Sequence, residues 1–334
     1  MKRGPLALSL GDPAGIGPEI IVKAWRALRL EQIPFFVVGD AQALASAPTA
    51  SAGLVRKVSS PDEAAAVFPE AIPVLDLPLK APVVAGQPTS AAASAIIQWI
   101  ETAVGLALSG AVSGVVTAPI AKAPLYAAGF KFPGHTEFLG ELTAAASYDG
   151  ARGPIMMLTA ADLRATLVTV HEPLAMVAEK LTIEAVVNAG LVTAQAMRRD
   201  FGVARPRIAV AGLNPHAGES GTIGQEETKI VEPAVRALVD LGVDARGPYP
   251  ADTMFPAEVR ATYDAAVCLY HDQALIPVKM LDFWGGVNVT LGLPIVRTSP
   301  DHGTAFDIAG RGLARPDSLI AAIRLAAGIA KRRP

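Results

Sequence analysis

The 334-residue sequence lacks several features that mark whole classes of protein. It has one cysteine, Cys268, so no disulfide framework can form within the chain, which suits a reducing compartment. Cys268 lies in an apolar run and is interpreted as a small buried core residue rather than a nucleophile. The net charge of −2 provides no excess positive charge for binding nucleic acid.

Long apolar segments are also missing. The apolar stretch before Gly11 is only about five residues long, too short for the hydrophobic region of a signal peptide. Residues 102–121 carry no charge, but three glycines and Pro119 interrupt them, and only seven are Leu, Ile or Val. A buried helix, a turn at Gly110 and a strand explain this stretch better than a membrane span. We therefore expect a soluble, cytoplasmic protein.

Apolar residues make up 51% of the chain, enough to bury a large core, and the length predicts two domains. Short β-branched runs alternate with Ala-rich segments, which predicts an α/β fold with a largely parallel sheet. Strands are expected at 6–10, 35–39, 114–118, 154–158, 165–170, 207–213, 265–270 and 287–291. Helices are expected at 91–109, 183–200 and 225–241, the last interrupted at Pro233.

Three of the five histidines follow expected strands: His171, His216 and His271. Ligands of α/β folds bind beyond the carboxyl ends of the strands, so three neutral imidazoles at such positions can hold one divalent metal. Taken singly, each histidine is better explained as a hydrogen-bonded structural residue. Their shared position after strands makes a metal site and three structural residues equally good explanations of the set. Imidazole ligands favour zinc, cobalt or nickel over magnesium, which prefers oxygen.

Other polar residues sit beside apolar stretches. Lys279, Asn288 and Arg297 lie in "LIPVK", "GGVNVTLG" and "LPIVRTS". A buried cation requires an anion, because desolvating an unpaired charge is costly, and a phosphate or carboxylate ligand would meet that need. The N-terminal stretch "GDPAGIGPE" differs from the G-x-G-x-x-G fingerprint of dinucleotide-binding folds.

Several segments resemble known families. "HGTAFDIAGRGLARP" (302–316) resembles the cofactor-binding segment of isocitrate and isopropylmalate dehydrogenases, and "GDPAGIGPE" resembles their opening "GDGIGPE". The closer resemblance is to the 4-hydroxythreonine-4-phosphate dehydrogenase family. It rests on "GDPAGIGPE", "GHTE", "LNPHAGE", "DT-x-F" (252–255), "YHDQ" and "NVTLGLP-x-x-RTSPDHGTA", which occur in order and cover nearly the whole chain.

The resemblance implies a two-domain α/β/α architecture like that of isocitrate and isopropylmalate dehydrogenases, with an active site in the interdomain cleft. We expect residues 1–130 and 285–334 to form a first α/β domain on the cofactor side. Residues 131–284 are expected to form a second α/β domain that carries the metal ligands and the dimerisation surface.

The resemblance also assigns residues. The implied metal ligands are His171, His216 and His271. The implied substrate contacts are His135, Thr136, Lys279, Asn288 and Arg297. The implied cofactor-binding residues are Asp301, His302, Gly303, Asp307 and Gly310. Asp272 and Lys279 are the candidate catalytic residues, and Asp272 either orients an imidazole or accepts a proton. Ala274 stands where many family members have glycine after "HDQ".

The implied activity is oxidation of 4-phosphohydroxy-L-threonine with NAD or NADP and one divalent metal per subunit (Zn, Co or Mg). The product would decarboxylate to 3-amino-2-oxopropyl phosphate, in the biosynthesis of pyridoxal or pyridoxine 5′-phosphate (vitamin B6). The family is homodimeric with a site shared between subunits, and neither nucleic acid nor membrane is an expected partner. The alternatives are a sister dehydrogenase acting on threonate or erythronate 4-phosphate or on an aromatic cis-dihydrodiol, and a phosphate acyltransferase.

Overall fold

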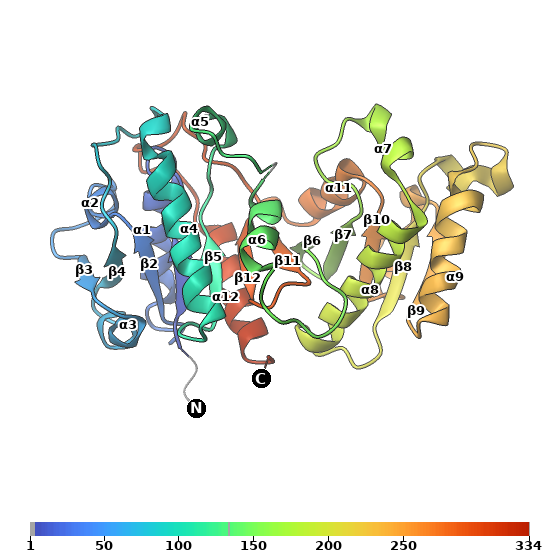
Figure 1. The fold of residues 1–334 in the computed structure, drawn as a ribbon, viewed down its shortest axis with the longest axis horizontal. Coiled ribbons are helices and arrows are strands. Elements are labelled where there is room, and N and C mark those ends of the chain that lie inside the picture. Colours follow the sequence, from blue (N-terminus) through green and yellow to red (C-terminus); the bar gives the residue numbers. More distant parts are fainter. Residues whose placement is uncertain (1–3, 133, 334) are drawn as a thin grey trace. The chain divides into compact units, whose positions relative to one another are not determined.

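The computed structural model describes residues 4–132 and 134–333. The chain divides into two compact units (Figure 1). Unit 1 comprises Met1–Ala146 and Pro294–Lys331, and unit 2 comprises Ser147–Leu293 and Arg332–Pro334. Each unit alternates strands with helices, and most strand pairs are parallel. The predicted α/β class with a largely parallel sheet is confirmed.

Unit 1 contains a wholly parallel run of six strands in the order β3-β4-β2-β1-β5-β12. Their bounds are β1 (Leu6–Ser9), β2 (Phe35–Gly39), β3 (Val55–Val58), β4 (Ile72–Asp76), β5 (Gly114–Thr117) and β12 (Arg297–Pro300). Strands β1, β2 and β5 are buried along their whole length, as parallel strands covered on both faces are. The sequence patterns missed β3, β4 and β12.

Helices surround this part of the sheet. They are α1 (Gly17–Leu28), α2 (Ala41–Ala45), α3 (Pro61–Val67), α4 (Ala93–Leu108), α5 (Lys122–Ala127), α6 (His135–Thr143) and α12 (Asp317–Ala330), with a short turn of helix at Ser90–Ala92. By length and composition alone, Ser90–Leu108 could cross a membrane. However, α4 packs on β1, β2 and β5, burying Ile96, Trp99 and Ile100. It is a core helix of unit 1, as expected for residues 91–109.

Unit 2 has six strands in the order β11-β6-β7-β10-β8-β9. They are β6 (Ile155–Ala160), β7 (Leu163–Leu167), β8 (Arg207–Ala211), β9 (Asp244–Tyr249), β10 (Ala265–Cys268) and β11 (Val287–Leu291). β6 pairs antiparallel with β7 and β11, and the remaining pairs are parallel. Cys268 is fully buried in this core, and burial raises the pKa of its thiol to about 12, so it is unreactive.

The helices of unit 2 are α7 (Leu174–Lys180), α8 (Ile183–Arg199), α9 (Glu232–Asp240), α10 (Ala257–Arg260) and α11 (His271–Leu281). Short helical turns lie at Pro215–Gly221, Glu227–Val231 and Ala251–Thr253. The interruption expected at Pro233 is confirmed, since a new helix starts there with the proline in its first turn.

The boundaries of the two units differ from the boundaries expected for the domains. Residues 131–146 belong to unit 1, because α6 packs on α4 and Phe138 packs edge-on against Phe130. The last residues of the chain belong to unit 2, where Arg333 forms a two-pronged ion pair with Asp200.

Candidate active site

A buried cation lies at the start of β12 in unit 1. The side chain of Arg297 is only 2% exposed, and burial lowers its pKa to about 10. Its Nη2 donates a 2.6 Å hydrogen bond to Oγ1 of Thr117, at the end of β5, and lies 3.4 Å from Nδ1 of His135. Thr117 thus helps to fix the guanidinium beside His135, a role that the sequence patterns did not predict.

His135 is a neutral imidazole at ordinary pH. Burial and the positive charges of Arg297 and Lys122 hold its pKa well below 6.5. Because the guanidinium faces Nδ1, that nitrogen acts as an acceptor and the ring proton sits on Nε2. Within the described part of the chain, Nε2 is buried and has no hydrogen-bond partner. It is therefore a donor available to a ligand.

His135 and Thr136 open helix α6, after Gly134 at its N-cap. Among the residues that the structure describes, no side chain caps this end, and backbone N–H groups at a helix start favour an anion. Three of the predicted substrate contacts therefore lie in unit 1, where the structure brings Arg297 against His135 and Thr136 follows directly.

The two signature loops of unit 1 lie side by side. The backbone N–H of Ile16 donates to the carbonyl of Thr304 at 2.9 Å. Glu19, buried in α1, accepts from the N–H groups of Gly312 and Ala314. Lys23, one turn later, bonds to Glu19 and to both carbonyls of those residues. The "GDPAGIGPE" segment therefore anchors the "HGTAFDIAGRG" segment through these hydrogen bonds, a role that no pattern in the sequence revealed.

Four of the predicted cofactor residues lie in this anchored segment, and Asp301 directly precedes it. The N–H of Asp301 bonds to Oγ of Ser318, and Nδ1 of His302 lies 3.0 Å from the carbonyl of Gly303. Asp307 and Gly310 are exposed.

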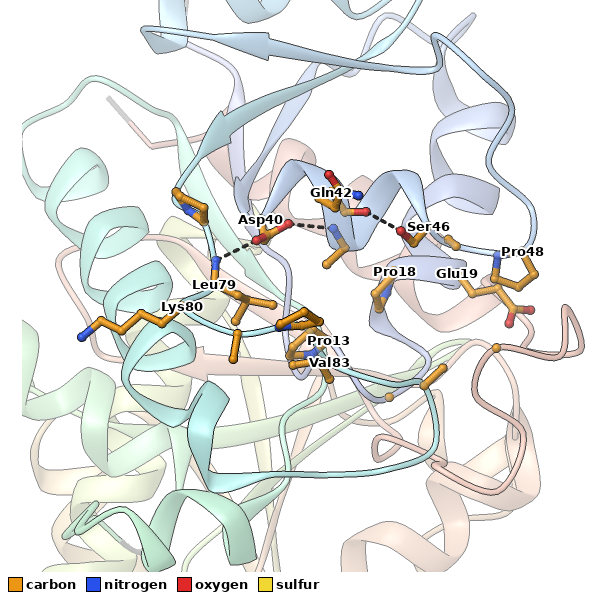
Figure 2. A pocket seen from close by; sticks show the side chains of 18 residues that line it. Pro13, Pro18, Glu19, Asp40, Gln42, Ser46, Pro48, Leu79, Lys80 and Val83 are labelled. Atoms are coloured by element: carbon orange, nitrogen blue, oxygen red, sulfur yellow. Dashed lines mark hydrogen bonds between the residues drawn. The ribbon is translucent and has the colours of Figure 1, made fainter.

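Gly310 also lines a cavity of about 640 Å³ at the carboxyl ends of β1, β2 and β4 (Figure 2). Its walls include the loop residues Pro13 and Gly15. In Figure 2 the carboxylate of Asp40 turns to the backbone N–H groups of Ala43 and Leu79, which donate to it at 2.7 Å each. Asp40 therefore shapes the cavity through the chain around it.

In unit 2, parallel strands β7, β10 and β8 are neighbours, so the three predicted metal ligands follow adjacent strands at one edge of the sheet. The rings of His171 and His271 lie with their centroids 5.9 Å apart. Both side chains line a cavity of about 290 Å³. Nδ1 of His271 is 2.6 Å from Oδ1 of Asp272, a contact that fixes the ring and leaves Nε2 for another partner.

His216 is in different surroundings. It is exposed in the turn Pro215–Gly221 with φ of 54°, the left-handed region. Glu227, which is buried, holds the entry to this turn by accepting from the N–H groups of Leu213 and Asn214. Over residues 4–132 and 134–333, no group of three or more His, Cys, Asp or Glu side chains is arranged to hold a metal. One chain therefore does not gather His216 with the other two.

The residues of the "YHDQ" motif have two different roles. Gln273 is buried, with its Oε1 accepting from Leu269 N–H and its Nε2 donating to the Gly212 carbonyl, both at 2.7 Å. It ties the end of β10 to the end of β8. Asp272 is exposed and His271 is half-buried, and both line the cavity of about 290 Å³.

The remaining predicted contacts also lie in unit 2. Nζ of Lys279 lies 5.3 Å from the ring centroid of Phe283. Asn288 is on β11, and its Oδ1 is buried with no hydrogen-bond partner among the residues described. A buried polar atom of this kind needs a ligand or water to satisfy it.

Comparison with known proteins identifies the family. Residues 31–326 match the model of "Pyridoxal phosphate biosynthetic protein PdxA". The chain is 70% identical, over 100% of its length and 99% of the other's, to the 4-hydroxythreonine-4-phosphate dehydrogenase of Caulobacter vibrioides.

Two solved structures extend this comparison. A 4-hydroxythreonine-4-phosphate dehydrogenase from Klebsiella pneumoniae superposes with a TM-score of 0.86 at 42% identity, covering 98% of this chain and 99% of that one. A terephthalate 1,2-cis-dihydrodiol dehydrogenase from Burkholderia xenovorans has a TM-score of 0.63 at 32% identity, covering 97% and 98%. The chain belongs to the PdxA family, and the family predicted from the sequence motifs is confirmed.

Proposed function

We propose that this member of the PdxA family oxidises 4-phosphohydroxy-L-threonine with NAD+ or NADP+ to 2-amino-3-oxo-4-phosphooxybutanoate. This β-keto acid loses CO2 to give 3-amino-2-oxopropyl phosphate, a step of pyridoxal and pyridoxine 5′-phosphate biosynthesis. The proposal is supported by relatives that carry the name 4-hydroxythreonine-4-phosphate dehydrogenase. We further propose that the reaction takes place in the cytoplasm.

The observation that carries the proposal is the buried donor group of unit 1. Arg297 is a desolvated cation beside a neutral His135 whose buried Nε2–H awaits an acceptor. A phosphate dianion uses both, because charge-assisted hydrogen bonds are about twice as strong as neutral ones. Thr136 and the start of α6 add neutral donors. Lys279 and Asn288 are proposed as further contacts of the substrate.

The histidines suit a divalent metal. Imidazoles are borderline-soft donors, and His171 and His271 approach each other while Asp272 fixes the second ring. His171, His216 and His271 would hold the ion, with zinc and cobalt fitting this donor set better than magnesium. When bound, a divalent metal lowers the pKa of a substrate hydroxyl and stabilises the negative charge that develops on its oxygen.

Asp272 is proposed chiefly as a positioning residue. Its Oδ1 contacts Nδ1 of His271 at 2.6 Å, which sets the tautomer of the ring. The same carboxylate is 69% exposed, so it can also take a proton and pass it to water. Lys279 is the second candidate for proton transfer, as an ammonium that would also neutralise charge on the substrate.

We propose that the nicotinamide cofactor binds along Asp301, His302, Gly303, Asp307 and Gly310, where it accepts the hydride. Support comes from the anchoring of this segment by Glu19 and from the cavity that Gly310 lines. A cavity of about 640 Å³ falls within the ordinary range of small-molecule sites.

A homodimer is proposed because, over the described residues, one chain does not bring all three predicted metal ligands together. Helix α11, which begins with His271, continues into a surface that exposes large apolar side chains. We name this surface the α11 apolar face: Ile276, Met280, Phe283 and Trp284, which are 64%, 82%, 60% and 50% exposed. A second copy covering this face would bury apolar area next to a metal ligand.

One alternative has its own support, since the terephthalate dihydrodiol dehydrogenase is 32% identical to this chain. The test is a panel of 4-phosphohydroxythreonine, threonate 4-phosphate, unphosphorylated 4-hydroxythreonine and a dihydrodiol, each with NAD+ and NADP+. We expect 4-phosphohydroxythreonine to have the highest kcat/KM. Preference for threonate phosphate would move the assignment to a sister enzyme, and preference for the dihydrodiol would reject phosphate recognition.

A further inference from the structure

A lysine that no motif singled out lies at the rim of the same donor group in unit 1. Strand β5 ends at Thr117, the hydrogen-bond partner of Arg297, and five residues later Lys122 opens α5. The intervening loop is tied to the N-terminal signature, because Asp12 donates its N–H to the carbonyl of Pro119 at 2.9 Å. One connection thus supplies a fixed support for Arg297 and a second cation.

Lys122 points its ammonium at the start of α6. A Cβ placed on Gly134 would lie 3.5 Å from Lys122 Nζ. Gly134 has φ of −170°, an extended conformation that any residue can adopt. A glycine suits this position because neighbouring side chains leave little room for a Cβ, not because of its backbone conformation. The ammonium therefore reaches the residue that precedes His135.

The imidazole of His135 consequently lies within reach of two positive charges. Arg297 and Lys122 both act, after burial, to lower its pKa. Two cations and a buried imidazole donor around one helix start form a strongly electropositive group, and such a group is stabilised by a dianion.

A nearby carboxylate offers a different explanation for Lys122. Oε2 of Glu137 is 3.1 Å from the same Cβ position on Gly134 and is buried without a hydrogen-bond partner in the described ranges. Yet Lys122 and Glu137, which both lie in the described ranges, form no ion pair with each other. The ammonium is exposed and available.

We infer that Lys122 is a further contact for the phosphate of the substrate, completing the group formed by His135 and Arg297. The inference rests on the proposed function in placing a phosphate at His135. It adds a positively charged side chain that approaches from the side of α5, and it makes Lys122 a specificity residue for phosphorylated over unphosphorylated substrates.

The test compares three variants of the full chain. Lys122→Met removes the charge and keeps the length, and Lys122→Arg keeps the charge. Lys131→Met removes an exposed lysine whose charge is not among those that lower the pKa of His135. The first readout is binding of inorganic phosphate, measured by isothermal titration calorimetry at low salt without cofactor or substrate. The second is KM for 4-phosphohydroxythreonine and for 4-hydroxythreonine.

We expect Lys122→Met to weaken phosphate binding and raise KM for the phosphorylated substrate by about tenfold. KM for the unphosphorylated substrate should stay within about twofold, Lys122→Arg should recover most of the loss, and Lys131→Met should behave as the unaltered chain. Unchanged phosphate binding in Lys122→Met would overturn the inference. An equal rise in KM for both substrates would also overturn the inference. It would indicate that Lys122 acts as the charge partner of Glu137 instead.

The two proposals fail separately. A chain that binds phosphate through Lys122 but does not oxidise 4-phosphohydroxythreonine retains this inference and loses the proposed function. A chain that oxidises 4-phosphohydroxythreonine with KM indifferent to Lys122 retains the function and loses the inference.

Discussion

The two units present their functional side chains in opposite surroundings. In unit 1 the guanidinium of Arg297 is 2% exposed, and Thr117 holds it beside His135. In unit 2 the side chains of His271 and Asp272 are 36% and 69% exposed, and His216 is not gathered with them. One chain thus brings the donor group of unit 1 together, whereas it does not bring the three histidines of unit 2 together.

This difference separates two physical strategies. A buried cation is costly to desolvate and is stabilised by an anion, so the group around Arg297 in unit 1 favours a negatively charged ligand. In unit 2, His171 and His216 are exposed and His271 is half-buried, so these imidazoles carry little desolvation cost without the proposed metal and second chain. We therefore expect phosphate binding to persist in variants that no longer bind metal. We also expect metal binding to persist in variants that no longer bind phosphate.

The largest expected effect is in unit 2. His216→Ala should reduce bound metal and lower turnover by about 10³-fold, because a metal contributes several kcal/mol to stabilising charge on the reacting oxygen. Inorganic phosphate should bind as before, since unit 1 is untouched. Elemental analysis and calorimetry measure the two properties. A variant that keeps one metal per subunit would remove His216 from the site.

The reciprocal change is in unit 1. Arg297→Ala should cost on the order of 2–5 kcal/mol in transition-state stabilisation for the phosphorylated substrate and little for the unphosphorylated one. Metal content should be unchanged. Steady-state kinetics with both substrates tests this, with circular dichroism as the check on folding. Similar losses on the two substrates would show that Arg297 does not recognise the phosphate.

The third change concerns the α11 apolar face. Met280→Glu places a charge where we expect a second copy, so the dimer should dissociate and turnover should fall by about tenfold or more, while phosphate binding persists. Leu30→Glu is the matched control, since Leu30 in unit 1 is 83% exposed against 82% for Met280. Light scattering reports the mass. A fully active monomer would reject the shared site.

The smallest effect is on stability against pH. The pKa of His135 is well below 6.5 in the folded chain, so below pH 6.5 the unfolded chain takes up a proton that the folded chain does not. Stability should therefore fall as the pH drops from 6.5, by up to ~1.4 kcal/mol per pH unit from this group. His135→Gln should show a smaller fall in urea unfolding between pH 7.5 and 5.5. An identical fall would mean that His135 is protonated in the folded chain.

Sequence patterns predicted the strands best where burial is complete or nearly so. Phe35–Gly39, which is buried throughout, and Val287–Leu291, which is buried except at Asn288, have the expected bounds, because buried strands consist mainly of apolar, β-branched residues. Val55–Val58 was missed because it is a partly exposed edge strand containing Arg56 and Lys57. Arg297–Pro300 was missed because its buried residues are polar.

The motifs identified many of the important polar residues but did not reveal how each one acts. Gln273, Glu19 and Glu227 lie in or beside the signature segments, yet each satisfies backbone groups of a neighbouring loop. Those partners are up to 295 residues away in the chain, as for Glu19 and Ala314, so no local pattern could reveal them. Lys122 was not predicted for the same reason, because its ammonium lies near Gly134 only in the folded chain.

The most direct test of the central claim, that the buried group around Arg297 and His135 recognises a phosphate dianion, is one ratio. It is kcat/KM for 4-phosphohydroxythreonine divided by kcat/KM for 4-hydroxythreonine, with the unaltered chain, saturating NAD+ and added divalent metal. We predict a ratio of about 10² or more, falling toward 1 in Arg297→Ala. A ratio near 1 for the unaltered chain would contradict the account.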